Sequence, residues 1–564
     1  MNPENTPAHL PFYLTIISAF LFVATMMVFV NSVNAEFVNW DDDIYVTENP
    51  LVQSLTVENV KGILSTSYYY GWTPVTLLSH AIDFSLWGMN AKGHHLTNVL
   101  LHAINTVLLF FVTIVVIDSA RARDERTLRA RITPSMLVGS LIGALLFAMH
   151  PLRVESVAWV SGRKDLLCTL FLLISLWTYI IWKQRGKKRL HVVSMIAFAL
   201  ALLSKPTAII FPIVLILLDA LLLNKTEGRS AWNEILIDKI GFLVLSGIAA
   251  VITWLAASGG GVNVIGELNA IERVLLPFYM ITFYLVKLVV PLDLSPVYPD
   301  VDTVLLYLSP LIVIGLLSVG YVLMKRQIAA FMLAVASYML MLLPVYLGIS
   351  SGLQPLADRY TYLSTLSIFM LIGGGIDLYW RASAASAGKK YQRELLAFVL
   401  LCLCAVSAYR TIRHASVWHD SVSLWKQALR YAPQTIDEFN RRRPYMKPSY
   451  ADARLNLGVA YYTRKNVDSA LVQFQTVLRF DSCNADAHYN IGNVLYEKAE
   501  TALSLRSFER AVRCDSRYAK AFYNLGILYA AQDSVALALQ SFQSAARLGY
   551  ADAQRILTER GYGW

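Results

Sequence analysis

The chain has 564 residues, of which 56% are hydrophobic and only 16% are charged. So much apolar surface exceeds what one interior can bury, which excludes a single soluble globule. The net charge of +10 does not indicate nucleic-acid binding, because the basic residues cluster in short loops between apolar segments, where they orient a membrane protein during insertion.

Apolar stretches long enough to cross or enter a bilayer recur along the first 411 residues. The first is longer than the apolar core of a signal peptide and no clear small-residue cleavage site follows it, so we expect a retained span. The predicted fold class is all-α, with about 11–12 membrane segments at 11–33, 95–117, 135–149, 164–182, 192–204, 206–223, 240–258, 273–290, 303–322, 327–347, 358–378 and 394–411.

Two loops rich in basic residues set the predicted orientation, because such loops remain on the cytoplasmic side. This orientation places the N-terminus inside and the large loop 34–93 outside. The first basic loop contains Arg121, Arg123, Arg126, Arg129 and Arg131, and the second contains Lys183, Arg185, Lys187, Lys188 and Arg189.

The segment 273–290 conflicts with this orientation. Three apolar segments separate the basic residues Arg229 and Lys325, although two inside loops require an even number of crossings. We expect 273–290 to be the re-entrant or interfacial element, because it carries Lys287 and leads into a proline-rich stretch. A span with an atypical loop charge is the alternative.

A repeat of 34 residues begins after the last apolar segment. The triplets Asn456-Leu-Gly458, Asn490-Ile-Gly492 and Asn524-Leu-Gly526 recur at this spacing, with Phe474, Phe508 and Phe542 in step. Thirty-four residues is the tetratricopeptide period, in which the small residue lets two helices approach and the Phe fills the space between them. We therefore predict a membrane domain at 1–411, a degenerate repeat and linker at 412–449 and an α-solenoid at 450–564, outside the membrane on the same side as loop 34–93.

Three consecutive carboxylates, Asp41, Asp42 and Asp43, follow the first span. A solvated turn or a helix cap would explain an isolated acidic run. Here the loop is also rich in aromatic residues, and its amphipathic stretch 73–87 is expected to lie in the membrane interface and hold the carboxylates over the membrane core.

Positive charge recurs on the same predicted side of the membrane. The second outer loop, 150–165, is dense in ionisable residues, and further cations follow at later outer turns. A single Arg at a helix end commonly snorkels or pairs with a carboxylate, but several together favour an anion site, and lipid phosphate is the anion available at a membrane. The phosphate candidates are Arg153, Arg163, Lys205 and Arg359.

Carboxylates and cations together predict a glycosyl transfer. A carboxylate can deprotonate an acceptor hydroxyl while Arg and Lys stabilise the charge on a phosphate leaving group. An isoprenoid-linked sugar would be the donor. A lipid phosphatase or a flippase would use the same residue types.

The runs Phe37–Pro50, Gly93–His102, His150–Trp159 and Ala357–Tyr360, followed by the repeats, resemble the transmembrane-and-tetratricopeptide O-mannosyltransferases and their bacterial relatives. The resemblance covers nearly the whole chain. It implies the GT-C glycosyltransferase fold, an acidic first outer loop, a polyprenyl-phosphate sugar donor and protein O-mannosylation, with the bacterial inner membrane or its equivalent as the location.

The resemblance also implies roles for individual residues. It gives the catalytic base as Asp41 or Asp42, with Asp43 as a neighbour, and places His150 and Glu155 on the acceptor side. A divalent metal stays open, with His150, Glu155 and Asp43 as candidate ligands. His94 and His95 are further outer-loop candidates, and the sugar, the acceptor and the oligomeric state are left open.

Two other functions compete with the transferase. One is a non-catalytic membrane scaffold whose repeats recruit envelope-assembly partners, and the other is a transporter or ligase of lipid-linked glycans. The predicted partners of the transferase are membrane lipid, a polyprenyl-phosphate sugar, and a protein or glycan acceptor that the repeats would present. The five cysteines show neither metal-type spacing nor a disulfide framework, so we expect no redox chemistry.

Overall fold

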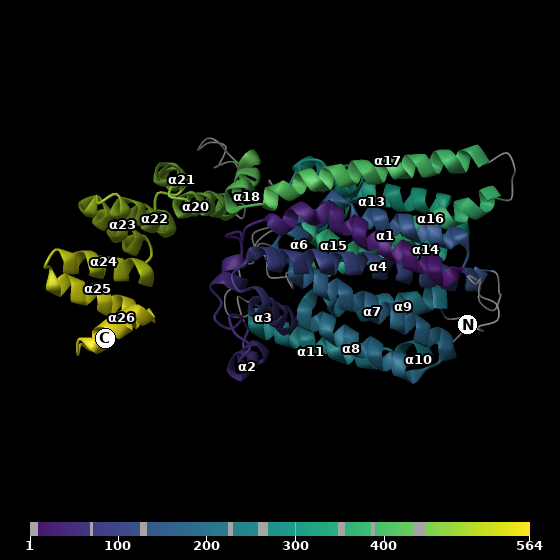
Figure 1. Ribbon diagram of the computed structural model, residues 1–564, viewed down its shortest axis with the longest axis horizontal. Helices are drawn as coiled ribbons and strands as arrows, with labels where there is room; N and C mark the ends of the chain where they lie inside the picture. The colour runs from purple at the N-terminus through teal and green to yellow at the C-terminus, as the bar shows by residue number, and fades with distance from the viewer. Residues whose placement is uncertain are drawn as a thin grey trace. The chain divides into compact units, whose positions relative to one another are not determined.

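The structure is a computed structural model that describes residues 9–67, 71–124, 132–223, 229–257, 269–298, 301–347, 356–384, 390–432 and 447–564 (Figure 1). The chain divides into two compact units, Met1–Asp420 and Ser421–Trp564. Every regular element in the described ranges is a helix. The all-α prediction is therefore confirmed, and the two units are described separately below.

The helices of the first unit run mostly along one direction, with α1 and α17 lying side by side (Figure 1). They are α1 (Leu10–Phe29), α2 (Val57–Ser65), α3 (Pro74–Trp87), α4 (Ala91–Asp124), α5 (Pro134–Ala148), α6 (Val154–Ala158), α7 (Arg163–Arg185), α8 (Lys188–Ser204), α9 (Phe211–Leu218), α10 (Arg229–Ile237), α11 (Ile240–Ala257), α12 (Ala270–Val289), α13 (Thr303–Leu323), α14 (Ile328–Tyr346), α15 (Thr361–Ser364), α16 (Leu366–Ala384) and α17 (Lys390–Ala415).

Within the described ranges, seven helical segments are long and apolar enough to cross a membrane, which confirms a multi-pass membrane protein. Two bent helix pairs, one at α5–α6 and one at α15–α16, raise this number to nine if each pair is one span. The predicted segments at 192–204, 240–258 and 273–290 are not among these, so the count falls below the predicted 11–12. The seven are Leu10–Asn34, Ala91–Arg121, Val160–Arg185, Pro206–Leu223, Thr303–Leu323, Ile328–Tyr346 and Tyr391–Trp418.

The segment predicted to be re-entrant forms one unbroken helix, α12. Its first turn is closed by a capping box in which Asn269 and Glu272 each bond the other's backbone N–H. Lys287, near its other end, donates to the carbonyl of Leu292 over 2.6 Å, so its charge folds back onto the following loop. Whether α12 crosses the membrane or lies in its interface stays a prediction.

Helices α5 and α16 pack with their backbones almost in contact. A Cβ added to Gly139 would lie 2.2 Å from the carbonyl oxygen of Gly373, and one added to Gly143 would lie 2.7 Å from that of Phe369. Glycines spaced four residues apart allow this approach, which replaces the hydrophobic driving force that helices lack within lipid. This contact holds the α15–α16 pair, and the residues before it, against the second outer loop.

The second unit stacks helix pairs. Cβ atoms added to Gly458, Gly492 and Gly526 would lie 2.4, 2.6 and 2.7 Å from the rings of Phe474, Phe508 and Phe542. The predicted fit of small residue against Phe is therefore confirmed in three successive repeats. The helices are α18 (Ser421–Ala428), α20 (Lys447–Thr463), α21 (Val467–Phe480), α22 (Ala485–Glu497), α23 (Thr501–Cys514), α24 (Ala519–Ala531), α25 (Val535–Arg547) and α26 (Ala551–Glu559).

A disulfide joins Cys483, in the loop after α21, to Cys514 at the end of α23. The sequence showed no disulfide framework, and this single bond was not predicted. The spacing gave no warning, because the two residues lie 31 positions apart and meet only when successive repeats stack. The remaining cysteines, Cys168, Cys402 and Cys404, are free.

Candidate active site

Asp41 and Asp42 are adjacent but lie in different environments. Asp41 has a φ of +63°, a left-handed conformation that is uncommon for residues other than glycine. Its side chain is half-buried, and no described residue donates a hydrogen bond to its carboxylate. Backbone strain at a residue with an unoccupied carboxylate is typical of a functional position.

Asp42 is fully buried (0% exposed), and both its oxygens are occupied. One accepts from the amide of Val38 over 3.0 Å, and the other accepts from the amide and the hydroxyl of Ser161 over 3.0 and 2.6 Å. Ser161 belongs to the loop 150–165. Asp42 therefore ties the loop 34–93 to the loop 150–165.

Burial raises the pKa of Asp42 to about 7, although the hydrogen bonds from Ser161 and Val38 oppose this shift. Burial likewise raises the pKa of Asp43, whose carboxylate accepts from the amide of Ile44 over 2.9 Å. The three carboxylates thus divide into an anchor, Asp42, a neighbour bonded to the next amide, Asp43, and one with an open carboxylate, Asp41.

His94 and His95 lie on α4 behind the first loop. His95 bonds the carbonyl of Glu36 through Nε2 over 3.3 Å, and the ring of His94 packs edge-on against Phe37. Both side chains are buried. They position the backbone that leads into the aspartates, and the structure does not place them in open space.

Arg153 and Arg163, predicted to bind phosphate, are both buried and already bonded within the protein. Arg163 pairs with Asp83 of α3 over 2.6 Å and donates to Asn98 of α4 over 2.8 Å. Arg153 donates to the carbonyl and the hydroxyl of Thr361 over 2.9 and 3.0 Å. These residues connect helices at the end of the membrane unit that carries the loop 34–93.

The other two phosphate candidates are also paired. Lys205 contacts Asp165 over 2.5 Å. Arg359 forms an ion pair with Glu155, and its amide donates to the second oxygen of the same carboxylate over 2.9 Å. Glu155 therefore meets a cation from a distant part of the chain.

Lys164 is the cation that the sequence argument passed over. It is 8% exposed, and in the described part of the chain its ammonium has neither an ion pair nor a hydrogen bond. It lies 4.9 Å from the ring centroid of Tyr45 and 5.2 Å from that of Trp159, within the range of a cation–π contact. The sequence could have indicated Lys164 as a candidate, because it lies between Arg163 and Asp165 at the start of an apolar helix.

Three tryptophans join the first loop, the second loop and the end of the last span. The indole N–H of Trp159 donates to the carbonyl of Trp40 over 2.8 Å, and its ring stacks on that of Trp418 at 5.8 Å. The amide of Glu36 also donates to the carbonyl of His419 over 2.8 Å. The segment that precedes the second unit is therefore packed against the loop that carries Asp41.

His150 does not face the aspartates. Its Nε2 bonds the carbonyl of Leu288 over 2.9 Å, and its Nδ1 accepts from the amide of Leu152 over 3.2 Å. Among the residues that the structure describes, no three His, Cys, Asp or Glu side chains form a group that could hold a metal ion. The proposed convergence of His150 with Glu155 and Asp43 is thus not seen.

Comparison with known protein families gives matches in both units of the chain. Residues 137–254 match the dolichyl-phosphate-mannose-protein mannosyltransferase family, and residues 461–498 and 489–553 match tetratricopeptide repeats. The first match includes the second outer loop, Lys164 and Lys205, but neither Asp41 nor Arg359.

Curated relatives that match part of the chain agree with these family matches. The protein O-mannosyl-transferase TMTC4 of Homo sapiens is 30% identical over 210 residues, which are 35% of this chain and 28% of that protein. TMTC4 of Mus musculus is 27% identical over 242 residues, 40% of this chain and 32% of that protein. Protein O-mannosyl-transferase Tmtc1 of Drosophila melanogaster is 34% identical over 194 residues, which are 32% of this chain and 20% of that protein. The chain thus matches about a third or less of the length of these curated relatives.

The fold and the repeats define a multi-pass helical membrane protein with a tetratricopeptide-repeat unit. In sequence the chain is similar to the TMTC protein O-mannosyl-transferases over the matched regions, the resemblance that its motifs predicted.

Proposed function

We propose that this protein is a membrane glycosyltransferase. It transfers a sugar, mannose by analogy with the named relatives, from a polyprenyl phosphate to a hydroxyl of a protein or glycan outside the cytoplasm. The observation that carries the proposal is the pair of unused charges at one end of the membrane unit, the open carboxylate of Asp41 and the unpaired ammonium of Lys164. All four cations predicted to bind phosphate are instead bonded internally.

Asp41 is the proposed general base. Its carboxylate takes the proton of the acceptor hydroxyl as the oxygen attacks the anomeric carbon, and the bond between that carbon and the phosphate oxygen breaks. The product is a glycoside of inverted configuration, and the leaving group is the polyprenyl phosphate. The backbone of Asp41 is left-handed, whereas that of the neighbouring Asp42 is right-handed.

Lys164 is the proposed contact of the leaving phosphate. Its ammonium is desolvated between two rings, where an added anion would be attracted more strongly than in water. Asp42 helps to set its position relative to Asp41, because Ser161, which bonds Asp42, lies three residues before Lys164. The hydrogen bonds between Asp42 and Ser161 would therefore position both the proposed base, Asp41, and the proposed phosphate contact, Lys164.

The extracytoplasmic side is proposed from two supports. The disulfide between Cys483 and Cys514 is of a kind that persists in oxidising compartments. The chain leaves the membrane unit at Trp418, which stacks on Trp159 beside the aspartate loop. The repeats and the aspartates would therefore share the oxidising side, where the repeats present the acceptor.

Transfer of labelled mannose from polyprenyl-phosphate mannose to endogenous acceptors, in membranes that contain the overexpressed protein, tests the proposal. Asp41→Asn should lower the rate at least ~100-fold, the usual contribution of a general base. Glu58→Gln, on the exposed surface of α2 in the same loop, is the matched control and should transfer normally. Normal transfer by well-expressed Asp41→Asn would overturn the assignment of the base.

The same assay separates the transferase from a scaffold. If neither mannose nor another polyprenyl-phosphate sugar is transferred by the wild type, and deletion of residues 421–564 alone abolishes the cellular function, the transferase proposal fails and the repeats carry the function.

A further inference from the structure

The two peptide planes that meet at the Cα atom of Asp41 are both held by hydrogen bonds. The carbonyl of Trp40, which belongs to the peptide bond before Asp41, accepts from the indole N–H of Trp159 over 2.8 Å. The carbonyl of Asp41 itself accepts from the amide of Tyr45 over 2.8 Å. A residue other than glycine keeps a positive φ only where its surroundings hold it there. The backbone of Asp41 therefore depends on where the ring of Trp159 lies.

Trp40, Trp159 and Trp418 form a tryptophan cluster in which Trp418 supports the other two. The rings of Trp159 and Trp418 stack with their centroids 5.8 Å apart and 30° between their planes, and both side chains are 1% exposed. The ring centroid of Trp40 lies 6.3 Å from each of the other two. Such pairs contribute more than the area that they bury. Trp418 thus contacts both the donor and the acceptor of the hydrogen bond that precedes Asp41.

Trp418 comes from the end of the last span and is fixed there by the backbone around it. It closes the short helix Ser416–Trp418 that follows α17, and the next carbonyl, that of His419, accepts from the amide of Glu36 over 2.8 Å. Further back on α17, the hydroxyl of Thr411 donates to the carbonyl of Met149 over 2.7 Å. The chain is therefore held against the aspartate loop shortly before the second unit begins.

The contacts of the Trp418 side chain are ring contacts. Among the residues that the structure describes, its indole N–H has no hydrogen-bond partner. Another flat ring at this position should therefore support Trp159, whereas a small side chain should not.

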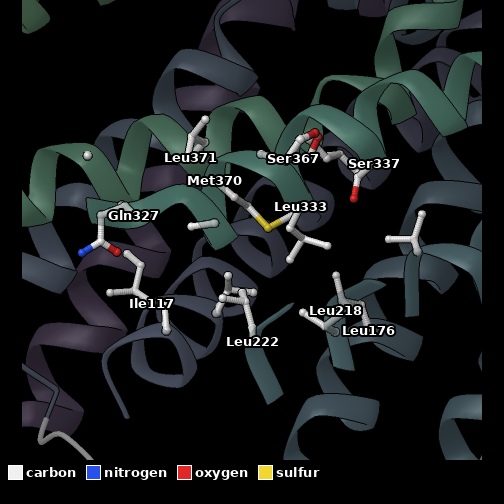
Figure 2. A pocket seen from close by; sticks show the side chains of 18 of the residues that line it. Ile117, Leu176, Leu218, Leu222, Gln327, Leu333, Ser337, Ser367, Met370 and Leu371 are labelled. Atoms are coloured by element: carbon white, nitrogen blue, oxygen red, sulfur yellow. The ribbon is translucent and has the colours of Figure 1, made fainter. Parts of the chain in front are cut away.

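The tryptophan cluster is separate from the apolar cavity of the membrane unit. That cavity lies between α4, α7, α9, α14 and α16, and in Figure 2 Leu218 and Leu222 lie across it from Met370 and Leu371. The three tryptophans are not among its lining residues. A substitution at Trp418 therefore adds or removes no atom of the cavity wall, and its effect is expected through the aspartate loop.

We propose that Trp418 is a positioning residue for Asp41, so that the segment joining the membrane unit to the repeats is part of the active site. The inference rests on the proposed function, in which Asp41 is the base. Trp418 holds the ring of Trp159, and Trp159 holds the peptide unit before Asp41. The carboxylate then keeps its place relative to the acceptor hydroxyl, where a misplacement of ~1 Å can lower a rate ~100-fold.

The first test compares transfer from polyprenyl-phosphate mannose in membranes with matched amounts of full-length variants. Trp418→Ala should lower kcat at least ~10-fold and leave KM for the donor within about twofold, because the base is displaced and the donor contact is not. Trp418→Phe keeps a stacking ring and should stay within about twofold of the wild type. Trp177→Ala is the matched control, since it removes one ring of a stacked pair with Phe111 in the membrane unit. Trp418→Leu replaces Trp418→Ala if that variant does not accumulate.

The second readout is amide hydrogen exchange of the peptide 38–48 in detergent. The amide of Tyr45, which bonds the carbonyl of Asp41, should exchange at least ~10-fold faster in Trp418→Ala than in the wild type. Trp418→Phe and Trp177→Ala should exchange as the wild type does. Normal kcat in Trp418→Ala, an equal loss in Trp418→Phe, or unchanged exchange of this peptide would overturn the inference.

Hydrogen exchange needs no sugar transfer, so the inference and the proposed function fail separately. Faster exchange in Trp418→Ala, in a protein whose wild type transfers no sugar, would keep Trp418 as the support of this backbone and remove the transferase. Transfer that depends on Asp41 but not on Trp418 would keep the enzyme and remove Trp418 from its active site.

Discussion

Charged residues around the loops 34–93 and 150–165 differ in whether they already have a partner of opposite charge in the protein. Arg163, Lys205 and Arg359 each meet a carboxylate inside the protein, and a buried pair of this kind positions helices. Among the described residues, neither the carboxylate of Asp41 nor the ammonium of Lys164 has an ion-pair partner of opposite charge. A charged group without a partner in the protein is available to a substrate. Asp41 and Lys164 are therefore the two candidates for contacts with a substrate.

Replacing Lys164 with Met should weaken use of the donor. Methionine keeps an unbranched chain between Tyr45 and Trp159, where sulfur also packs well against rings, but it removes the charge. We expect kcat/KM for the polyprenyl-phosphate sugar to fall about 100-fold, a loss typical of one electrostatic contact to a developing anion. Steady-state kinetics would measure this, and Lys164→Arg should recover part of the loss. Unchanged kinetics in Lys164→Met would remove Lys164 from the site.

Asp42 should make the stability of the protein fall as pH rises. Its pKa of about 7 lies above the ordinary 3.8, so between these values the folded state holds a proton that the unfolded state has released. Raising the pH from 5 to 7 therefore favours the unfolded state, and the loss of stability levels off only well above pH 7, once the folded carboxyl is ionised too. The melting temperature of the wild type minus that of Asp42→Asn should decline over this range. A flat difference would show that burial does not raise this pKa.

At the scale of the helix, close packing at glycines positions the elements of the site. The contact between Gly139 of α5 and Gly373 of α16 leaves no room for a side chain. Since α15 and the short helix at Asp358–Tyr360 precede α16, this contact also sets where Arg359 meets Glu155.

Gly143→Val should therefore destabilise the membrane unit. The new Cβ would lie 2.7 Å from the backbone oxygen of Phe369, and backbone cannot move aside as a flexible side chain can. Overpacking of this kind costs typically ~1–3 kcal/mol. The matched control is Gly374→Val, where the nearest atom to an added Cβ is 3.9 Å away. Equal thermal stability of the two variants in detergent would contradict the packing argument.

Periodicity predicted the helices well, because a span and a 34-residue repeat are local patterns. The ion-pair partner of each charged residue could not be predicted in the same way. Arg163 and Arg359 have the same residue type and a similar setting in the sequence, and only the fold shows that their partners are Asp83 and Glu155. The roles of Asp41 and Asp42 also separate only through a backbone angle and a contact with Ser161.

At the scale of the molecule, the two units differ in how they are stabilised. The membrane unit buries paired charges among apolar helices, whereas the repeat unit gains a covalent link between its stacked pairs. In a repeat array each helix pair contacts mainly its neighbouring pairs. The disulfide joins two successive pairs, so it limits their separation from each other.

Replacing Cys483 and Cys514 with Ser should lower the stability of the repeat unit by about 3 kcal/mol, since loss of a disulfide releases the unfolded chain. Chemical denaturation followed by circular dichroism of the repeat unit would measure the change. Non-reducing peptide mapping of the full chain from membranes should recover the two cysteines linked. Recovery of free thiols in native membranes would contradict both the link and the proposed oxidising side.

The pairing of Asp165 with Lys205 has a consequence for how the chain enters the bilayer. Helix α7 begins with three charged residues, and each charge inside a membrane costs about 2.5–3.5 kcal/mol on translocon insertion scales. Asp83, the partner of Arg163, is synthesised before α7, but Lys205 follows Asp165 by 40 residues. All of α8 is therefore synthesised before Lys205 can pair with Asp165, so we expect α7 and α8 to enter the membrane together as one hairpin.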